Sequence, residues 1–168
     1  MDVRLTQEQI EYHNYLYKQG CKFIQEEFLL GENKSTEKDN LQSQEKLFNA
    51  LNLFEQVLKI NPNNWSAMWC IGKIYQRVEI LDIAFNWFEK AYLFKPDNAD
   101  ISREACICAI GLANSKAAIF YGETALKINP NDVGLLSNLS LAYLKAGRIN
   151  DAKDKAQKAL NINSRNSI

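Results

Sequence analysis

The sequence predicts an all-α chain, built as an α-solenoid of stacked antiparallel helix pairs. Apolar residues recur at the three- and four-residue spacing of amphipathic helices. Similar phrases around proline recur about every 34 residues, which is typical of a repeat architecture. Only 3 prolines and 7 glycines occur in 168 residues, and this composition argues against an all-β chain with many turns.

Residues 1–64 form a divergent block, whose spacing predicts an elongated helical hairpin. We expect its helices at about residues 6–30 and 40–61, joined by the charged loop GENKSTEKDN. Apolar positions at helical spacing mark the first helix (Ile10, Tyr17, Cys21, Ile24, Phe28) and the second (Leu41, Leu47, Phe48, Leu51, Phe54, Leu58). The hairpin serves either as an N-terminal cap or as an arm that reaches across a groove or to another subunit.

Three regular blocks follow, at residues 65–98, 99–132 and 133–166, and with residues 1–64 they make one expected domain, residues 1–168. Each block predicts two short helices. In residues 65–98 the first helix runs from about Ser66 to Arg77, and Asn64 is its expected N-cap.

The helix ends within these blocks are also predicted from the sequence. The second helix of residues 65–98 starts near Asp82 and ends before Pro96, because proline cannot continue a helix. In the later blocks the breaks fall at LANS and AGRIN, where Gly147 suits a helix end. Such short connections make the paired helices antiparallel neighbours.

The repeat period is set by proline and is shared by small and apolar residues. Pro62, Pro96 and Pro130 stand at equal intervals in the phrases KINPNN, FKPDN and KINPND. Six columns keep the same period: Ala50, Ala84, Ala118 and Ala152; Val57, Ala91, Ala125 and Ala159; Phe54, Phe88, Gly122 and Ala156; Ile71, Ala105 and Leu139; Gly72, Cys106 and Ser140; Tyr75, Ala109 and Tyr143. We expect these columns to be buried, with helix backbones meeting closely where they contain small residues.

Glycine in the middle of a helix supports this packing hypothesis. Gly72 and Gly122 each cost an isolated helix about 1 kcal/mol relative to alanine. A close crossing of two helices is the simplest compensation for that cost. The sequence therefore predicts that both glycines lie where a neighbouring helix approaches.

Motifs for catalysis, metal binding and cofactor binding are missing from the sequence. Cys21, Cys70, Cys106 and Cys108 lie among apolar neighbours, as buried reduced thiols do. Cys106 and Cys108 diverge by about 200° on a helix, so they are poorly placed to share a metal. His13 is expected to be a surface or cap histidine. We therefore expect no enzyme, no metal and no cofactor.

Charge and hydropathy limit the classes of partner. The net charge is zero, but residues 1–64 carry a formal charge of −3 and residues 133–168 one of +4, as counted from the sequence. Lysines near the C-terminus alternate with aspartates, so a basic stripe for nucleic acid is not expected. The start MDVRLTQEQIEY lacks the features of a signal peptide, and no apolar run is long enough for a membrane span. A cytoplasmic protein is the default expectation.

The regular blocks resemble tetratricopeptide repeats. Met68, Ile71, Gly72 and Tyr75, followed by Ala84, Phe88, Ala91 and Pro96, match that pattern, with methionine in the place of tryptophan and isoleucine in the place of leucine. The resemblance covers residues 65–166 fully and residues 41–64 in part. It implies a right-handed superhelix of helix pairs, in which the first helix of each pair lines a concave groove.

The resemblance also implies which residues face the groove. On the first helix of each block, they lie about 140° away from the core column. The predicted partner-binding groove residues are Trp69, Lys73, Gln76, Arg77, Arg103, Ile107, Ile110, Ser137, Leu141, Leu144 and Lys145. Alternatively, Trp69, Ile107 and Leu141 are buried by adjacent helices or by the N-terminal arm.

These expectations favour a non-catalytic adaptor that binds a protein segment. The mixture of an aromatic residue, aliphatic residues and cations suits an extended or helical peptide with acidic and apolar side chains. The alternative is a self-associating structural module, a homodimer for example, to which the uneven charge of the two ends points.

Overall fold

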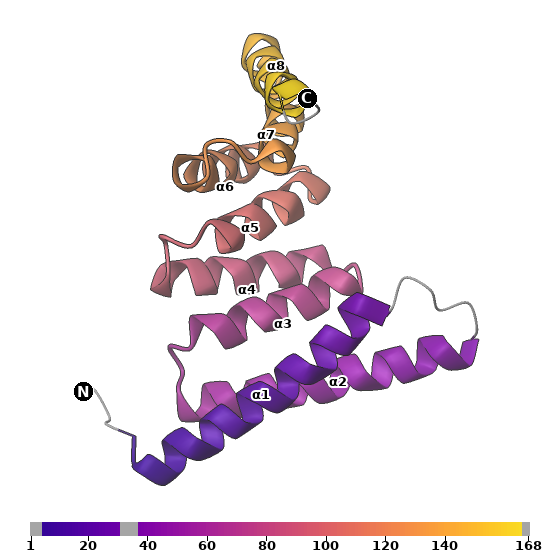
Figure 1. Ribbon diagram of the computed structural model, residues 1–168, viewed down its shortest axis with the longest axis vertical. Helices are drawn as coiled ribbons and strands as arrows, with labels where there is room; N and C mark the ends of the chain where they lie inside the picture. Colours follow the sequence, from indigo (N-terminus) through magenta and orange to yellow (C-terminus); the bar gives the residue numbers. More distant parts are fainter. Residues whose placement is uncertain (1–4, 31–36, 166–168) are drawn as a thin grey trace. The chain divides into compact units, whose positions relative to one another are not determined.

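In the computed structural model, residues 5–30 and 37–165 are described, and all regular structure in these ranges is α-helical (Figure 1). Side chains are described for residues 5–25 and 41–164. Eight helices occupy the described ranges: α1 (Gln7–Leu30), α2 (Glu37–Ile60), α3 (Trp65–Arg77), α4 (Leu81–Phe94), α5 (Ala99–Gly111), α6 (Ser115–Ile128), α7 (Val133–Lys145) and α8 (Ile149–Arg165). The predicted all-α fold class is confirmed.

Helix starts follow the period of the sequence. The helices α3, α5 and α7 begin at Trp65, Ala99 and Val133, and these starts are separated by the same number of residues as the prolines. The starts of α4, α6 and α8 have the same separation. The starts of α3 and α4 lie within one residue of the predicted positions, about Ser66 and near Asp82. In the N-terminal block, α2 begins about three residues earlier than predicted, and the rest of the predicted loop, residues 31–36, lies outside the described residues.

Asparagine and aspartate side chains cap α3, α5, α6 and α7, whereas Ile80 at the start of α4 makes no side-chain cap. The Oδ1 atom of Asn64 accepts a hydrogen bond of 2.8 Å from the backbone N–H of Ala67, which confirms its predicted capping role. Asn98, Asn114 and Asp132 cap α5, α6 and α7 in the same way. These caps satisfy backbone donors that the first turn of a helix leaves unpaired.

A left-handed residue ends the first helix of each regular pair. Glu79, Ala113 and Gly147 have φ angles of 61°, 56° and 74°, and they stand one period apart. The N–H of the next residue then bonds back to Tyr75, Ala109 or Tyr143, at 3.0, 2.8 and 2.9 Å. This geometry closes the helix end. Gly147 is the expected residue for it, whereas Glu79 and Ala113 adopt it with a Cβ atom.

Two compact units divide the chain, with the boundary between Ile74 and Tyr75, inside α3. In the first unit α1 packs against α2. Gly20 of α1 faces the ring of Phe54, because a Cβ atom there would lie 2.8 Å from its Cζ atom. The ring of Tyr17 packs edge-on against Phe54, at 5.7 Å between centroids.

The core face of α2 differs in two positions from the prediction. Leu41 and Phe48 are 68% and 62% exposed, so they do not belong to the core. The buried positions of α2 are Leu47, Ala50, Phe54 and Val57. Phe48 follows the buried residue Leu47 directly, so its side chain points about 100° away from the core face. The prediction counted apolar residues at helical spacing, and it therefore included residues next to the core face.

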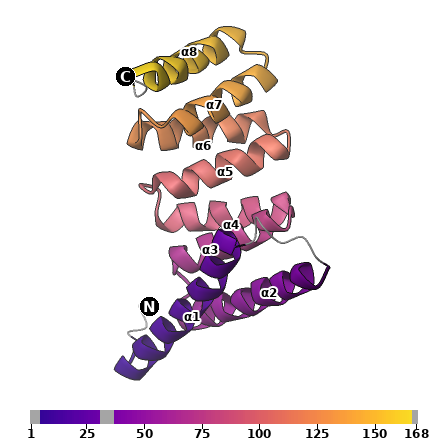
Figure 2. The same cartoon turned by 45° about the vertical axis from the view of Figure 1, so that its right-hand side comes forward.

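In the second unit α4 to α8 follow one another, and each contacts the next (Figures 1 and 2). The periodic columns form its core: Ala84, Phe88, Ala91, Ala105, Cys106, Ala109, Ala118, Ala125 and Leu139 are fully buried. The predicted burial of the alanine columns is therefore confirmed.

The approach at Gly122 involves side chains. A Cβ atom on Gly122 would lie 2.9 Å from Cδ1 of Leu139 and 3.2 Å from Sγ of Cys106. The predicted approach of a neighbouring helix to Gly122 is therefore confirmed, and the atoms nearest to the glycine are side-chain atoms. The glycine leaves room for the Leu139 side chain of the following helix pair.

Candidate partner-binding surface

The candidate surface in the second unit lies on α5 and α7, which contact each other directly. It consists of seven of the predicted residues: Arg103, Ile107 and Ile110 on α5, and Ser137, Leu141, Leu144 and Lys145 on α7. We call it the α5–α7 surface.

The apolar part of the α5–α7 surface is open to solvent on α7. Leu141 is 42% and Leu144 is 54% exposed, and residues three apart share one side of a helix. Ile107 and Ile110 on α5 are partly buried. For Leu141, the alternative of complete burial by adjacent helices is wrong.

The charged part of this surface is tied to the fold. Arg103 forms an ion pair with Asp132, the N-cap residue of α7, and lies 4.0 Å from Asp100. The Nζ atom of Lys145 donates a hydrogen bond of 3.2 Å to the carbonyl oxygen of Ile110. These two cations therefore link α5 to α7, in addition to any role toward a partner.

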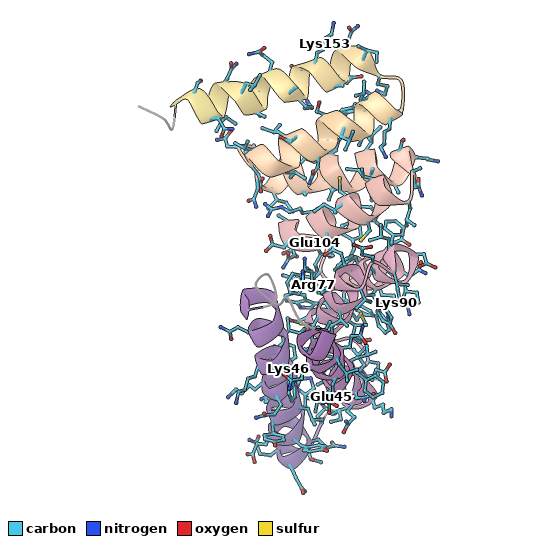
Figure 3. All side chains as sticks on the ribbon, turned by 90° about the vertical axis from the view of Figure 1, so that its right-hand side faces the viewer. Glu45, Lys46, Arg77, Lys90, Glu104 and Lys153 are labelled. Carbon is cyan, nitrogen blue, oxygen red and sulfur yellow. The ribbon has the colours of Figure 1, made fainter. Side chains whose placement is uncertain are left out.

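Gln76 and Arg77 end α3. The Nε2 atom of Gln76 donates a hydrogen bond of 2.9 Å to Oε2 of Glu104 and lies 3.7 Å from Sγ of Cys108. Arg77 is exposed, and Figure 3 labels it together with Glu104. Glu104 was not among the predicted site residues, although its place on α5, one residue after Arg103, could have marked it as a neighbour of the surface.

Trp69 and Lys73 belong to the first unit, and both are partly buried. The Nζ atom of Lys73 lies 6.0 Å from the ring centroid of Trp69, at the limit of a cation–π contact. The Nε1 atom of Trp69 is buried and has no hydrogen-bond partner among the described residues. The other nine predicted residues belong to the second unit.

Polar side chains of α1 meet the start of α3 in the first unit. His13 Nε2 lies 2.9 Å from Nδ2 of Asn64, the residue that caps α3. The Tyr17 and Ser66 hydroxyls share a short hydrogen bond. His13 is thus held by a capping residue, as a structural histidine would be.

The four cysteines are free thiols. Cys70, Cys106 and Cys108 are buried, and Cys21 is partly exposed. A hydrogen bond from the Cys70 thiol lowers the pKa of Cys21 to about 7, although burial opposes this shift. Among the described residues no group of three or more His, Cys, Asp or Glu side chains could hold a metal ion.

A second exposed surface, which the sequence analysis missed, lies on α4 and α6. Leu93 is 77% and Phe120 is 52% exposed. The Tyr92 ring packs edge-on against Phe120 and Tyr121, with centroids 6.1 and 5.3 Å apart. The Tyr121 hydroxyl donates to Glu89 at 3.0 Å, and burial together with this bond raises the pKa of Tyr121. The signal was the pair of aromatic segments Tyr92–Phe94 in α4 and Phe120–Tyr121 in α6, which lie beside the alanine columns.

None of the described helices combines the length and the apolar character that crossing a membrane requires.

Comparison with solved structures gives the fold. MamA AMB-1 has a TM-score of 0.69 at 18% identity, over 94% of this chain and 92% of that one. MamA MSR-1 has a TM-score of 0.67 at 16% identity, over 96% and 99%. A crystal structure of MamA has a TM-score of 0.67 at 14% identity, over 86% and 88%.

The chain has a tetratricopeptide-type fold. The resemblance predicted from the sequence is therefore confirmed at the level of the fold, because similarity at these identities concerns the fold alone. Stacked helix pairs of this type form extended surfaces that bind other proteins.

A curated relative is the transcription factor tau 131 kDa subunit of Saccharomyces cerevisiae (strain ATCC 204508 / S288c). It is 27% identical over 127 residues, which are 75% of this chain and 12% of that protein. The chain therefore spans only a small part of that relative's length. No protein-family model matches the chain.

Proposed function

We propose that this chain is a non-catalytic interaction module that binds a polypeptide segment on its α5–α7 surface. The observation that supports this most is the exposure of Leu141 and Leu144, 42% and 54%, side by side on α7. Exposed leucines beside cations suit a partner with apolar and acidic side chains. Gln76 and Arg77, which belong to the same unit, are proposed as further binding residues, and Trp69 and Lys73 stay predicted binding residues of the first unit.

The tetratricopeptide-type fold is consistent with this function. In the second unit each helix contacts the next, and in stacked helix pairs of this type one face of the first helices is available to a ligand. Arg103 and Lys145 are held by Asp132 and by the Ile110 carbonyl group. Their charges are therefore fixed in position before a partner binds, which lowers the entropic cost of binding.

The test is a selection of peptides from a displayed library on the intact chain, followed by binding to variants. A Leu141→Glu/Leu144→Glu double variant should lose affinity for the selected peptides by about a hundredfold, since it removes two apolar contacts and adds two carboxylates. The matched control is Leu93→Glu, an exposed leucine on α4. Equal loss in both variants, or no loss in the double variant, would contradict the proposal.

Self-association is a second candidate function. Ile10, Tyr12 and Tyr15 are 39%, 52% and 58% exposed on α1, and the opposite charges of residues 1–64 and 133–168 favour contact between copies. Light scattering over a concentration series, at low and high salt, tests it. A monomer throughout the series would exclude this candidate, whereas a salt-sensitive dimer would support it.

A further inference from the structure

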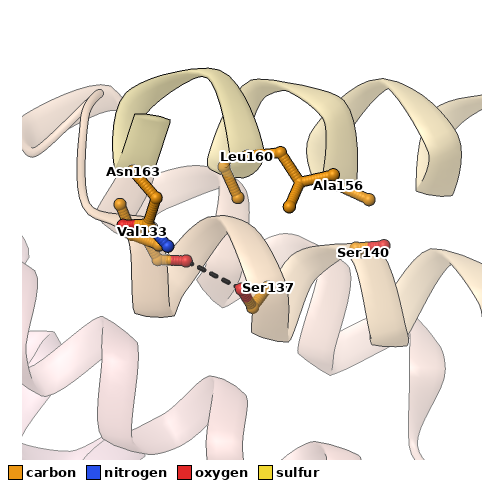
Figure 4. A pocket seen from close by; sticks show the side chains of 7 residues that line it. Val133, Ser137, Ser140, Ala156, Leu160 and Asn163 are labelled. Atoms are coloured by element: carbon orange, nitrogen blue, oxygen red, sulfur yellow. Dashed lines mark hydrogen bonds between the residues drawn. The ribbon is translucent and has the colours of Figure 1, made fainter. Parts of the chain in front are cut away.

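A cavity in the first unit differs in the chemistry of its walls from one in the second. The cavity between α7 and α8 has a volume of about 300 Å³, and its lining consists of apolar residues, serines and an asparagine (Figure 4). The cavity where α1 meets the start of α3 has a volume of about 360 Å³, and His13, Tyr17 and Ser66 are part of its lining. Ionisable side chains are therefore gathered between α1 and α3, within the first unit.

Contacts at this cavity show that α1 and the start of α3 run side by side in the same direction. His13 on α1 lies 2.9 Å from Asn64, the residue that caps α3. One turn further along α1, the hydroxyl of Tyr17 shares a hydrogen bond with that of Ser66, in the first turn of α3. Successive turns of α1 therefore meet successive positions of α3.

The next turn of each helix brings two thiols together. Cys21 stands four residues after Tyr17, and Cys70 stands four residues after Ser66, so each thiol lies on the same side of its helix as the hydroxyl before it. The Cys70 thiol donates a hydrogen bond to the sulfur of Cys21, and the Tyr17 hydroxyl donates a second one. These four side chains form one group, which we call the thiol cluster: Tyr17, Cys21, Ser66 and Cys70.

The two thiols of the cluster differ in exposure and in charge. Cys21 is partly exposed, whereas Cys70 is 4% exposed. The hydrogen bond from Cys70 lowers the pKa of Cys21 to about 7, against the effect of burial, and among the described residues no charged side chain contributes to this shift. The same bond, together with burial, raises the pKa of Cys70. At neutral pH an accessible thiolate, the nucleophilic form of cysteine, therefore lies beside a buried thiol that keeps its proton.

We propose that the thiol cluster is an oxidation site, at which Cys21 reacts with a hydroperoxide and Cys70 then closes a disulfide that joins α1 to α3. In the first step the Cys21 thiolate attacks one oxygen of the peroxide. An S–O bond forms, the O–O bond breaks, and the second oxygen leaves as alkoxide or hydroxide, which takes a proton from water. Cys21 is then a sulfenic acid.

In the second step the Cys70 sulfur attacks the Cys21 sulfur. An S–S bond forms, the S–O bond breaks, and the hydroxyl group leaves with the proton of Cys70 as water. In total two thiols are oxidised and one peroxide is reduced. Cys70 suits this step because it already contacts Cys21, and because the negative charge that raises its pKa disappears when Cys21 is oxidised.

The native chain provides the first test, which needs no variant. Alkylation of the folded full chain with iodoacetamide, followed by mass spectrometry of its peptides, measures the reactivity of each cysteine. We expect Cys21 to react at pH 7 at least about tenfold faster than Cys70, Cys106 and Cys108. One equivalent of hydrogen peroxide should then produce a Cys21–Cys70 disulfide within one chain, which a reducing agent reverses.

Variants separate the two roles of Cys70. Cys70→Ala removes the hydrogen-bond donor, so the midpoint of Cys21 alkylation against pH should rise from about 7 toward the ordinary value of about 8.5. Cys70→Ser keeps an O–H donor and should retain a lower midpoint, but peroxide should leave its Cys21 as a sulfenic acid that dimedone traps. Cys106→Ala, which removes a buried thiol of the second unit, is the matched control and should change neither result. Thermal melts of all three variants control for folding.

Three results would overturn the proposal. The first is alkylation of Cys21 no faster than that of the buried Cys106, and the second is a midpoint that Cys70→Ala leaves unchanged. The third is a peroxide product in which Cys70 keeps its thiol, whether Cys21 is then unpaired or joined to a second chain. The thiol cluster shares no residue with the α5–α7 surface, so these outcomes are independent of the proposed function.

Discussion

Three different residue types end the first helices of the regular pairs, and all three adopt the same backbone conformation. Glu79, Ala113 and Gly147 all have φ between 56° and 74°. For a residue with a Cβ atom this conformation costs about 1–2 kcal/mol, and glycine avoids that cost. The chain therefore carries strain at two of its three regular turns.

Exchanging alanine and glycine at these turns should change stability in opposite directions. Ala113→Gly is expected to raise the free energy of unfolding by up to about 1 kcal/mol, since relief of strain exceeds the added entropy of the unfolded chain. Gly147→Ala should lower it by a similar amount. Urea denaturation measures both, and a loss of stability in Ala113→Gly would show that the turn is not strained.

Glycines within helices separate into crowded and open positions. A Cβ atom on Gly122 would meet Leu139 at 2.9 Å, whereas one on Gly134 would have its closest contact, Oδ1 of Asp132, at 3.4 Å. Gly122→Leu should therefore lower the free energy of unfolding by about 1–3 kcal/mol through overpacking.

Gly134→Ala serves as the matched control for Gly122→Leu. It is expected to raise the free energy of unfolding by up to about 1 kcal/mol, because alanine is the better helix former. Denaturant titrations of the two variants and the native sequence make the comparison. A neutral Gly122→Leu would refute the tight fit around Leu139.

At the scale of a single helix, Asp132 stabilises α7 in two ways. Its Oδ1 atom accepts a hydrogen bond of 2.9 Å from the N–H of Leu135, and its carboxylate pairs with Arg103 of α5. The cap depends on an oxygen acceptor, whereas the ion pair depends on charge. The two contributions can therefore be separated by mutation.

Asp132→Ala is expected to lower the free energy of unfolding by about 1–2 kcal/mol, because it removes the cap and the ion pair together. Asp132→Asn should cost less, since asparagine caps helices well. Thermal and urea denaturation compare the variants. If Asp132→Asn is as destabilising as Asp132→Ala, the ion pair, and not the cap, accounts for the effect.

The contact of α7 with α6 makes stability depend on alkaline pH. Tyr143 is 3% exposed, and its hydroxyl donates to Glu123 of α6. Burial, followed by this hydrogen bond and the charge of Glu123, raises the pKa of Tyr143 from 10.0 to about 12. Burial also raises the pKa of Cys106 to about 12.

A raised pKa in the folded state means that ionisation favours unfolding. Tyr143 and Cys106 should therefore leave the free energy of unfolding unchanged below about pH 9. As these two groups ionise, the free energy of unfolding should fall between about pH 9 and pH 12. Tyr143→Phe should make this fall shallower. Urea titrations at several pH values measure the slope, and an unchanged slope in Tyr143→Phe would exclude Tyr143 as a contributor.

The helices could be predicted from the sequence because each periodic column depends on local spacing and burial. The ion-pair partner of Arg103 could not be predicted from the sequence. Asp132 lies far along the chain, beyond α6, and it meets Arg103 only when α5 packs against α7. The hydrogen bond from Lys145 to the Ile110 carbonyl group also forms only when α5 packs against α7, so it could not be predicted either. Exposure of Leu141 was predicted from its angle on the helix, whereas exposure of Phe48 and Leu41 depends on how α1 covers α2.

At the scale of the whole chain, stacked pairs contribute unequally to stability. Met68, Ser102 and Leu136 occupy equivalent positions one period apart, and all are buried. Ser102 brings a hydroxyl group that has no hydrogen-bond partner among the described residues, which costs about 1–3 kcal/mol. It also buries less apolar area than methionine or leucine.

Amide hydrogen exchange should reveal this difference along the chain. The N–H groups in the middle of α5 are expected to exchange faster than those of α7, and Ser102→Ala should slow exchange in α5 by about fivefold or more. Mass spectrometry of peptic fragments resolves the two helices. Equal protection of α5 and α7 would contradict the expectation.

A buried serine in the middle of a repeat array has a consequence for mechanical behaviour. Arrays whose units interact only with their neighbours can separate at their weakest junction. A chain stretched from its two ends would then yield first at α5, close to Ser102, while the flanking helix pairs kept their structure. The same position would determine where a protease first cuts the partly opened chain.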